Sequence, residues 1–241
     1  VQPAGGSLGP AVPAHRCEPG NNTWARMMGR PLYGLNDSNG AYECISKEDY
    51  LVGDILVIRH VAPEPTGING QPVPGQRYYK KGIYLRSGTA GANLFLGRDR
   101  LSNLNNVSTR PAVDYPLKAH AYYIGLTNRR CRGEPIPALF RKKLTATGKL
   151  RREELIAGIE NIQFQYQIDG QYVDARQALD WSAVSAVRVW VLSRASCTEE
   201  GLIDESIYHL PHQNFSPGED SPNRQYRRKL YSSVFAIRNR L

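Results

Sequence analysis

Residues 162–168 read Ile162-Gln163-Phe164-Gln165-Tyr166-Gln167-Ile168. Apolar side chains and glutamines alternate in this stretch, which is the two-residue period of a β-strand with one buried and one solvated face. The pair Asp169-Gly170 follows at once and is typical of a tight hairpin turn. On both sides of this stretch, β-branched and aromatic runs bounded by turn residues predict further strands at 54–60, 82–86, 93–96, 120–126, 138–141, 187–192 and 230–236.

Helix signals are scarce by comparison. Residues 174–179, with Asp174 as the capping residue, suggest one or two helical turns, and Thr147-Gly148 predicts a second hairpin turn. With many strands and only short helices, neighbouring strands are expected to pair antiparallel. A sheet with one apolar face needs a cover, so either two sheets pack on each other or a helix preceding Val1 covers that face.

We therefore expect a single domain over residues 1–241, made of a loop-rich segment, a first set of strands and a C-terminal set of strands at 1–50, 51–145 and 150–241. The expected fold class is α+β, predominantly antiparallel β, with long loops. Two of these loops, 61–80 and 198–225, are rich in proline, glycine and asparagine.

Composition narrows the function classes. The chain has 241 residues, a net charge of +9 and 41% apolar residues, including 14 Tyr, 5 Phe and 3 Trp that can fill a core. It shows no glycine period, heptad run or internal repeat, which excludes collagen, coiled coils and solenoids. No apolar run reaches the roughly 18 residues that cross a bilayer.

The positive charge is gathered in short clusters that define a candidate patch for an anionic partner, either nucleic acid or anionic lipid. Dispersed charge that only keeps the protein soluble is the alternative, because no base-reading motif accompanies the clusters. The clustered residues are Arg129, Arg130, Arg132, Arg141, Lys142, Lys143, Arg151, Arg152, Arg227, Arg228 and Lys229.

Four cysteines, Cys17, Cys44, Cys131 and Cys197, are spaced too widely for a zinc knuckle. An even, scattered set favours two disulfides in an oxidising compartment, although four buried thiols in the cytosol are the alternative. Of the three possible connectivities, we favour Cys17–Cys44 and Cys131–Cys197, because the first pair would close an irregular, glycine-rich loop.

Signals for catalysis and metal binding are weak. The sequence lacks a nucleophile elbow, a Walker loop, a dinucleotide fingerprint and a zincin motif, so no catalytic residue, metal or cofactor is predicted. His209 and His212 lie three apart and Glu219-Asp220 sit in a loop; these are minor candidates for zinc and calcium. Asn-x-Ser/Thr triplets begin at Asn21, Asn36, Asn106 and Asn214.

Three stretches of the second half, in this order, resemble the C-terminal region of the PilW family of type IV minor pilins. They read ELIAGIENIQFQY at 154–166, VSAVRVWVLSR at 184–194 (after Trp181) and YRRKLYSSVFAIRN at 226–239. Residues 53–59, GDILVIR, resemble an earlier strand of the same family.

The resemblance implies a pilin-like head whose N-terminal α1 helix is truncated, with the native subunit anchored through that helix. It implies a non-enzymatic role in the priming and tip complex of a type IV pilus, supporting adhesion and twitching motility. The implied partners are other minor pilins, the major pilin and a PilY-type tip adhesin. The implied location is the periplasmic face of the inner membrane of a Gram-negative bacterium and then the pilus.

Loops 61–80 and 198–225 are expected to contribute to the partner contacts, since exposed loops and strand edges offer binding groups. Three alternatives stay open: a minor pseudopilin of a type II secretion system, a DNA-binding pilin of natural transformation, and a secreted hydrolase with dispersed catalytic residues.

Overall fold

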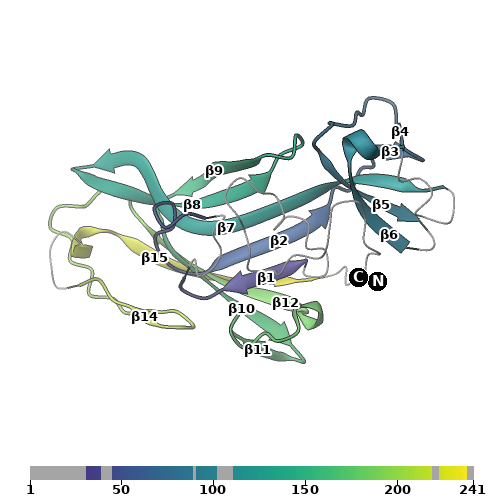
Figure 1. The fold of residues 1–241 in the computed structure, drawn as a ribbon. Coiled ribbons are helices and arrows are strands. Elements are labelled where there is room, and N and C mark those ends of the chain that lie inside the picture. The colour runs from purple at the N-terminus through teal and green to yellow at the C-terminus, as the bar shows by residue number, and fades with distance from the viewer. Residues whose placement is uncertain (1–30, 39–44, 89–90, 102–110, 219–222, 238–241) are drawn as a thin grey trace.

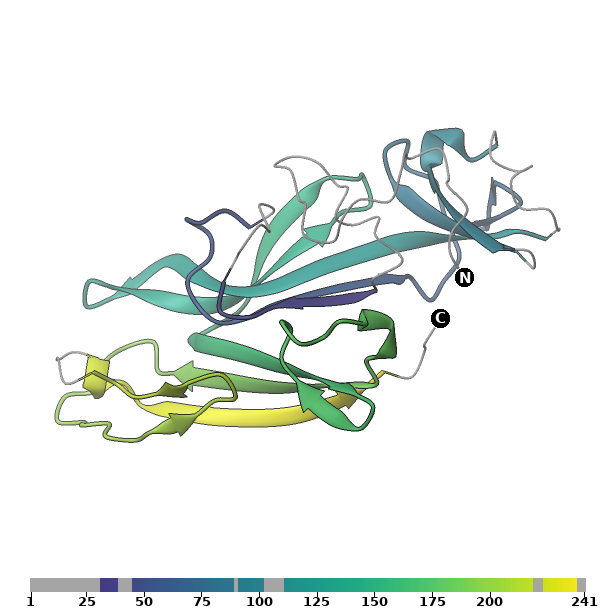
Figure 2. The same cartoon turned by 60° about the horizontal axis from the view of Figure 1, so that its bottom comes forward.

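The computed structural model describes residues 31–38, 45–88, 91–101, 111–218 and 223–237. Two β-sheets lie face to face as separate layers (Figure 2), and one strand of the upper layer extends beyond the lower one to carry a small lobe of further strands (Figure 1). The layers therefore form a β-sandwich with an extension at one end.

The first sheet is antiparallel throughout its pairings. Its central member is β7, a 19-residue strand that pairs with β2, β3, β5 and β8 at successive positions along its length. The strands are β1 (Leu32–Leu35), β2 (Ile55–Val61), β3 (Gly67–Ile68), β4 (Gln71–Pro72), β5 (Ile83–Gly88), β6 (Gly91–Leu96), β7 (Val113–Cys131), β8 (Glu134–Leu144) and β9 (Leu150–Ala157).

The second sheet has the order β11-β10-β12-β15 and is also antiparallel. Its strands are β10 (Ile159–Ile168), β11 (Gln171–Val173), β12 (Ala186–Arg194) and β15 (Arg228–Ala236). Asp169 and Gly170 both have positive φ, 50° and 81°, as the predicted two-residue hairpin requires. A separate hairpin of β13 (Tyr208–His209) and β14 (Asn214–Phe215) completes the described strands.

The expectation of an α+β, pilin-like fold with a truncated α1 helix was wrong. The described residues contain no α-helix; their helical elements are three 3-10 turns, η2 (Gly97–Asp99), η4 (Trp181–Ala183) and η5 (Asn223–Gln225). The cover for the sheet is a second sheet, the other possibility left open above. Residues 174–179 form only a turn in which the amides of Gln177 and Ala178 donate to the carbonyl of Asp174.

A hydrophobic core fills the space between the two sheets. Leu56 and Ile124 contribute from the first sheet and Phe164, Tyr166 and Val187 from the second. Trp181 of η4 closes one side of this core, because its ring lies 4.8 Å from that of Tyr166 and 5.1 Å from that of Tyr33, centroid to centroid. Since aromatic pairs at this spacing add to simple burial, η4 fixes the sheets together.

The opposite face of the first sheet is buried as well. Val57, Ala119, Ala121 and Tyr123 alternate with the residues that face the second sheet, and Ile45 packs on them. The central strands are therefore apolar on both faces over much of their length, which explains why 55–58 is a continuous apolar run rather than an alternating one.

At the far end of β7, a buried ion pair organises the lobe of β3 to β6. The guanidinium of Arg86 donates two hydrogen bonds to the carboxylate of Asp114, at 2.6 and 2.8 Å, and both side chains are fully buried. Tyr78 donates to the same carboxylate at 2.5 Å. Arg86 also donates to the carbonyl of Arg100 through Nη2 and lies over the ring of Phe95, whereas its buried Nη1 has no hydrogen-bond partner among the described residues.

Among the described residues, none of the helical elements has the length and apolar character of a membrane-spanning helix.

The chain passes from the first sheet to the second at Gly158, whose φ of 80° allows the sharp change of direction. Strand β9, which precedes this glycine, pairs with β8 and belongs to the first sheet.

Candidate functional site

The candidate site is the outer strand of the second sheet. In the described structure β15 pairs along one side with β12, in regular register over nine residue pairs, and ends the strand order of its sheet. From Leu230 to Ala236 it carries no charge and no proline. A long, uncharged, regular edge strand presents a row of backbone groups to which another strand can pair.

The free backbone groups of β15 can be assigned from its neighbours. The amide of Ala195 donates to the carbonyl of Arg227, and the amide of Ile237 donates to that of Ser185, so the odd-numbered residues direct their backbone groups toward β12. Because this direction alternates along a strand, Leu230, Ser232 and Val234 direct theirs to the open edge.

Apolar side chains beside this edge are unusually exposed. Tyr231 and Phe235 lie opposite Val191 and Val187, which belong to the core between the sheets, so both aromatic rings face the first sheet. They are nevertheless 52% and 60% exposed. The inner face of the second sheet is therefore only partly covered along β15, which adds an apolar strip to the hydrogen-bonding edge.

The corresponding edge of the first sheet is built differently. Strand β9 carries four consecutive charged residues at 151–154 and has a bulge at Leu155, where the register with β8 shifts. Charge and bulges are the usual devices that prevent edge pairing. Since β9 has both and β15 has neither between Leu230 and Ala236, the two edges are not equivalent.

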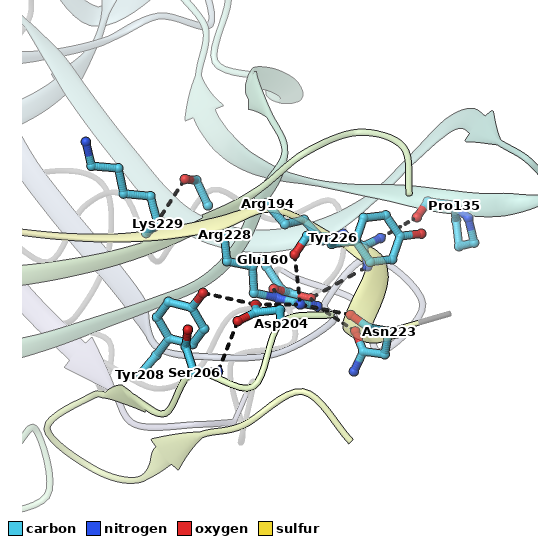
Figure 3. Close-up of polar contacts among 11 residues, drawn as sticks. Pro135, Glu160, Arg194, Asp204, Ser206, Tyr208, Asn223, Tyr226, Arg228 and Lys229 are labelled. Atoms are coloured by element: carbon cyan, nitrogen blue, oxygen red, sulfur yellow. Dashed lines mark hydrogen bonds and ion pairs between the residues drawn. The ribbon is translucent and has the colours of Figure 1, made fainter. Parts of the chain in front are cut away.

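A buried arginine fixes the start of β15 (Figure 3). Arg228 donates to both carboxylate oxygens of Glu160 on β10, at 2.6 and 3.1 Å, and to the carboxylate of Asp204 at 3.3 Å. It also donates to the backbone carbonyl and side chain of Asn223 in η5, at 2.9 and 2.5 Å. With its side chain fully buried, Arg228 has a structural role and cannot meet an anionic partner.

The network extends across the same end of the sandwich. Arg194 of β12 lies 3.6 Å from the carboxylate of Glu160 and donates to the carbonyl of Pro135 on β8 at 3.1 Å. Its guanidinium also lies 4.0 Å from the centroid of the Tyr226 ring. Because Pro135 and Arg194 belong to different sheets, this contact ties the layers together beside the start of β15.

The predicted disulfide between Cys131 and Cys197 is present, with the two Cα atoms 5.3 Å apart. Cys131 ends β7 and Cys197 follows β12, so the bond joins the two sheets at the end where Arg228 lies. Cys17 and Cys44, the other predicted pair, lie outside the described residues.

The predicted basic patch is not one surface. Arg129 is paired with Glu154, Arg152 with Asp49 and Arg227 with Glu199, while Arg130 and Arg132 donate to Gly133 and Thr198. Lys229 lies over the ring of Tyr231. Most of these charges are therefore engaged locally, which weakens the interpretation as a nucleic-acid surface.

Three members of the predicted patch, Arg141, Lys143 and Arg151, do share a face. Arg141 and Lys143 of β8 both contact Glu153 of β9, at 2.6 and 3.0 Å. Lys142, which alternates with them on β8, lies on the other face, and burial lowers its pKa. Arg151 lies opposite Lys143 on β9.

His209 and His212 do not come together as a metal site. His209 contacts the side chain of Asn214 across the β13–β14 hairpin at 3.0 Å, whereas His212 reaches the buried carboxylate of Asp54 at 3.0 Å and Asp174 at 3.2 Å. No metal-ligating cluster occurs within the ranges that the structure describes. Asn36 is buried and Asn214 exposed; Asn21, Asn106, Glu219 and Asp220 lie outside those ranges.

Comparison with known proteins finds one family match, and it covers the second sheet. The family model described as type IV pilus-assembly protein W matches residues 121–239, which include β10, β12 and β15. The matched segment is thus similar to type IV pilus-assembly proteins. Within that class the similarity is to the PilW family, which confirms the resemblance drawn from the sequence. No curated protein and no solved structure matches the chain.

Proposed function

We propose that this protein is a minor pilin of a type IV pilus, with a role in the complex that primes assembly and sits at the pilus tip. The proposed partners are other minor pilins, the major pilin and a PilY-type adhesin, reached at the periplasmic face of the inner membrane and then in the pilus. The observation that carries the proposal is the free edge of β15 inside the segment that matches a pilus-assembly family.

The proposed contact is the addition of an extended segment of a neighbouring pilus subunit to β15. Such an added strand would take the backbone groups of Leu230, Ser232 and Val234 as hydrogen-bond partners. Its apolar side chains would cover Tyr231 and Phe235, which are half-exposed beside the edge. Strand addition is suited to an assembly protein because backbone pairing supplies affinity and the flanking pockets supply specificity.

The loops proposed from the sequence as contact regions lie at opposite ends of the molecule. Residues 61–80 carry β3 and β4 in the lobe at one end, whereas residues 198–225 carry β13 and β14 near the start of β15 (Figure 1). The second loop therefore flanks the proposed docking edge, and we expect it to contribute more to the same contact.

Site-specific photo-crosslinking in the host cell tests the proposal. A photoreactive amino acid at Ser232 should crosslink to another pilus subunit, which mass spectrometry identifies. The matched control position is Ser87 of β5, an exposed serine in the distant lobe, where no such crosslink is expected. Crosslinks from Ser87 but not from Ser232 would contradict the proposed edge.

Two substitutions separate strand pairing from general surface effects. Ser232→Pro removes an amide that points to solvent, so it should leave the β12 ladder intact and abolish partner capture. Val234→Lys adds a charge to the edge and should act likewise, whereas Ser87→Lys adds the same charge elsewhere. Unchanged co-purification of pilus subunits with both edge variants would rule out pairing at β15.

A further inference from the structure

A cluster of basic side chains occupies one face of three adjacent strands of the first sheet. His60 of β2 lies opposite Lys118 of β7, and His120 of β7 lies opposite Lys143 of β8. Opposed residues in an antiparallel pair share a face, and so do residues two apart. Arg141, two residues from Lys143, completes the group.

These five side chains line an open pocket of about 410 Å³, which Leu144, Thr145 and Ala146 bound where β8 ends. The imidazole rings of His60 and His120 lie 5.7 Å apart, centroid to centroid. The pocket therefore places two imidazoles, two ammonium groups and a guanidinium around one space.

The positive charge of the pocket is not balanced. Glu153 neutralises part of it through its contacts with Arg141 and Lys143. Lys118 has no ion pair within the described ranges, and Arg151, opposite Lys143, adds another positive charge on β9. Four permanent cations thus meet one carboxylate on this face.

The state of His120 agrees with a local excess of positive charge. Burial, and after it the charges of Arg141, His60, Lys118 and Lys143, lower the pKa of His120 to about 4. Tyr122, on the same face, places its hydroxyl 3.4 Å from the Nδ1 atom of His120. At neutral pH the ring is therefore uncharged and can gain a proton when an anion enters.

We propose that this pocket binds a phosphate group, held by Lys118, Lys143 and His120. Three donors from adjacent strands can surround one tetrahedral oxyanion, and charge-assisted hydrogen bonds of this type are among the strongest that proteins form. The open shape admits a phosphate carried by a larger ligand as well as the free ion. The proposal is independent of the contact at β15, which involves the other sheet.

Nuclear magnetic resonance of His120 tests the site in two experiments. In the first, inorganic phosphate is added at constant pH. In the second, the pH is varied in the presence of inorganic sulfate, because sulfate keeps its charge over that pH range. The signal is assigned by its loss in His120→Gln. Addition of either ion should shift the His120 signal in a saturable way and raise its titration midpoint from about 4. No saturable shift with phosphate would overturn the proposal.

Matched variants locate the effect. Lys118→Gln should weaken phosphate binding about tenfold, the equivalent of one charge-assisted hydrogen bond, whereas Lys80→Gln removes the same charge from an exposed position outside the pocket. Equal weakening by both variants would mean that net charge, not a pocket, attracts the ion, and would overturn the proposal. An unchanged His212 signal shows that the variants stay folded.

The source of the phosphate is decided by competition. A short single-stranded oligonucleotide and vesicles containing phosphatidylglycerol are each added to the wild-type protein and to Lys118→Gln. If one of the two competitors displaces inorganic phosphate from the wild-type protein, that competitor is identified as the carrier of the phosphate group. Its displacement of phosphate should be absent in Lys118→Gln and should weaken as salt is added. Displacement by neither leaves the free or small-molecule phosphate as the ligand.

Discussion

The buried carboxylate of Asp54 connects β10 of the second sheet with two other segments of the chain, the one that follows β1 and the one between β13 and β14. This carboxylate accepts hydrogen bonds from the amide of Phe164 at 2.7 Å, the amide of Asp37 at 2.9 Å and the side chain of Asn36 at 3.2 Å. His212 completes the set at 3.0 Å. One carboxylate thus joins both sheets to the segment before β14. The free-energy cost of burying its charge is low, because several hydrogen-bond donors surround it.

The pH dependence of this junction can be predicted. Burial alone lowers the pKa of His212, but the hydrogen bond and charge of Asp54, with the charges of Asp174 and Asp37, raise it by more, so its pKa is raised overall. A raised folded-state pKa contributes stability that is complete below the unfolded value, about 6.5, and is lost as pH rises through the folded value.

His212→Gln should therefore cost more stability at pH 5.5 than at pH 8.5. Removal of a buried hydrogen-bonding partner costs about 1–3 kcal/mol, and the charged part of this loss should vanish at the higher pH. Urea unfolding followed by circular dichroism at the two pH values measures the difference. An equal loss at both would show that His212 acts only as a neutral donor.

The titration of His120 should change stability with pH in the opposite direction to that of His212. The pKa of His120 is lowered to about 4 by burial and by Arg141, His60, Lys118 and Lys143, so the unfolded chain takes up this proton first as pH falls. Stability is then lost between about pH 6.5, the unfolded value, and the folded value. His120→Asn should be less sensitive to acid than the wild type over this range in the same unfolding assay.

At the scale of elements, the attachment of β15 depends on Arg228. Arg228→Met leaves Asp204 without its cation and leaves Glu160 with only Arg194, so we expect a loss of about 3–5 kcal/mol in the free energy of unfolding. Arg227→Met, which breaks the exposed pair with Glu199, should cost much less, because solvent screens an exposed ion pair. Similar losses for the two neighbours, measured by urea unfolding, would contradict the role of burial.

Most of the longer strands could be predicted from local pattern, whereas the short strands β1, β3, β4, β11, β13 and β14 were not predicted. The alternation at 162–168 gives β10 correctly, but Gln163 on the expected wet face is fully buried, because the segment around His212 covers it and donates an amide to its side chain. Strand β9 was missed, since a charged edge strand need not alternate. The true length of β7 was missed because its partners change along it.

For the candidate sites, too, some features could be predicted from the local sequence and others depend on how the strands pair. The edge at 230–236 was visible as an uncharged strand, yet its free side follows from the strand order of the sheet. The phosphate pocket was missed because His60, Lys118 and Lys143 are distant in sequence and meet only through register. The spacing of Lys118 and His120, two apart on a strand, was the signal available.

At the scale of the whole molecule, the disulfide between Cys131 and Cys197 is a covalent cross-link between the two sheets. It closes a loop with a sequence separation of 66 residues, for which the chain-entropy model gives about 4 kcal/mol. The double variant Cys131→Ala, Cys197→Ala should lose a stability of this order in urea unfolding. A loss under about 1 kcal/mol would show that the sheets hold together without it.

The same bond sets the path of a mechanical load. If the protein is pulled by its two ends, the covalent path runs along β7, crosses from Cys131 to Cys197 and leaves through β15, so it bypasses the intervening strands β8 to β12. Full extension of the oxidised chain should then be shorter than that of the double variant Cys131→Ala, Cys197→Ala by about 230 Å, for a separation of 66 residues at roughly 3.5 Å per residue. Strand β15, peeled directly, becomes the first element to bear force in the second sheet.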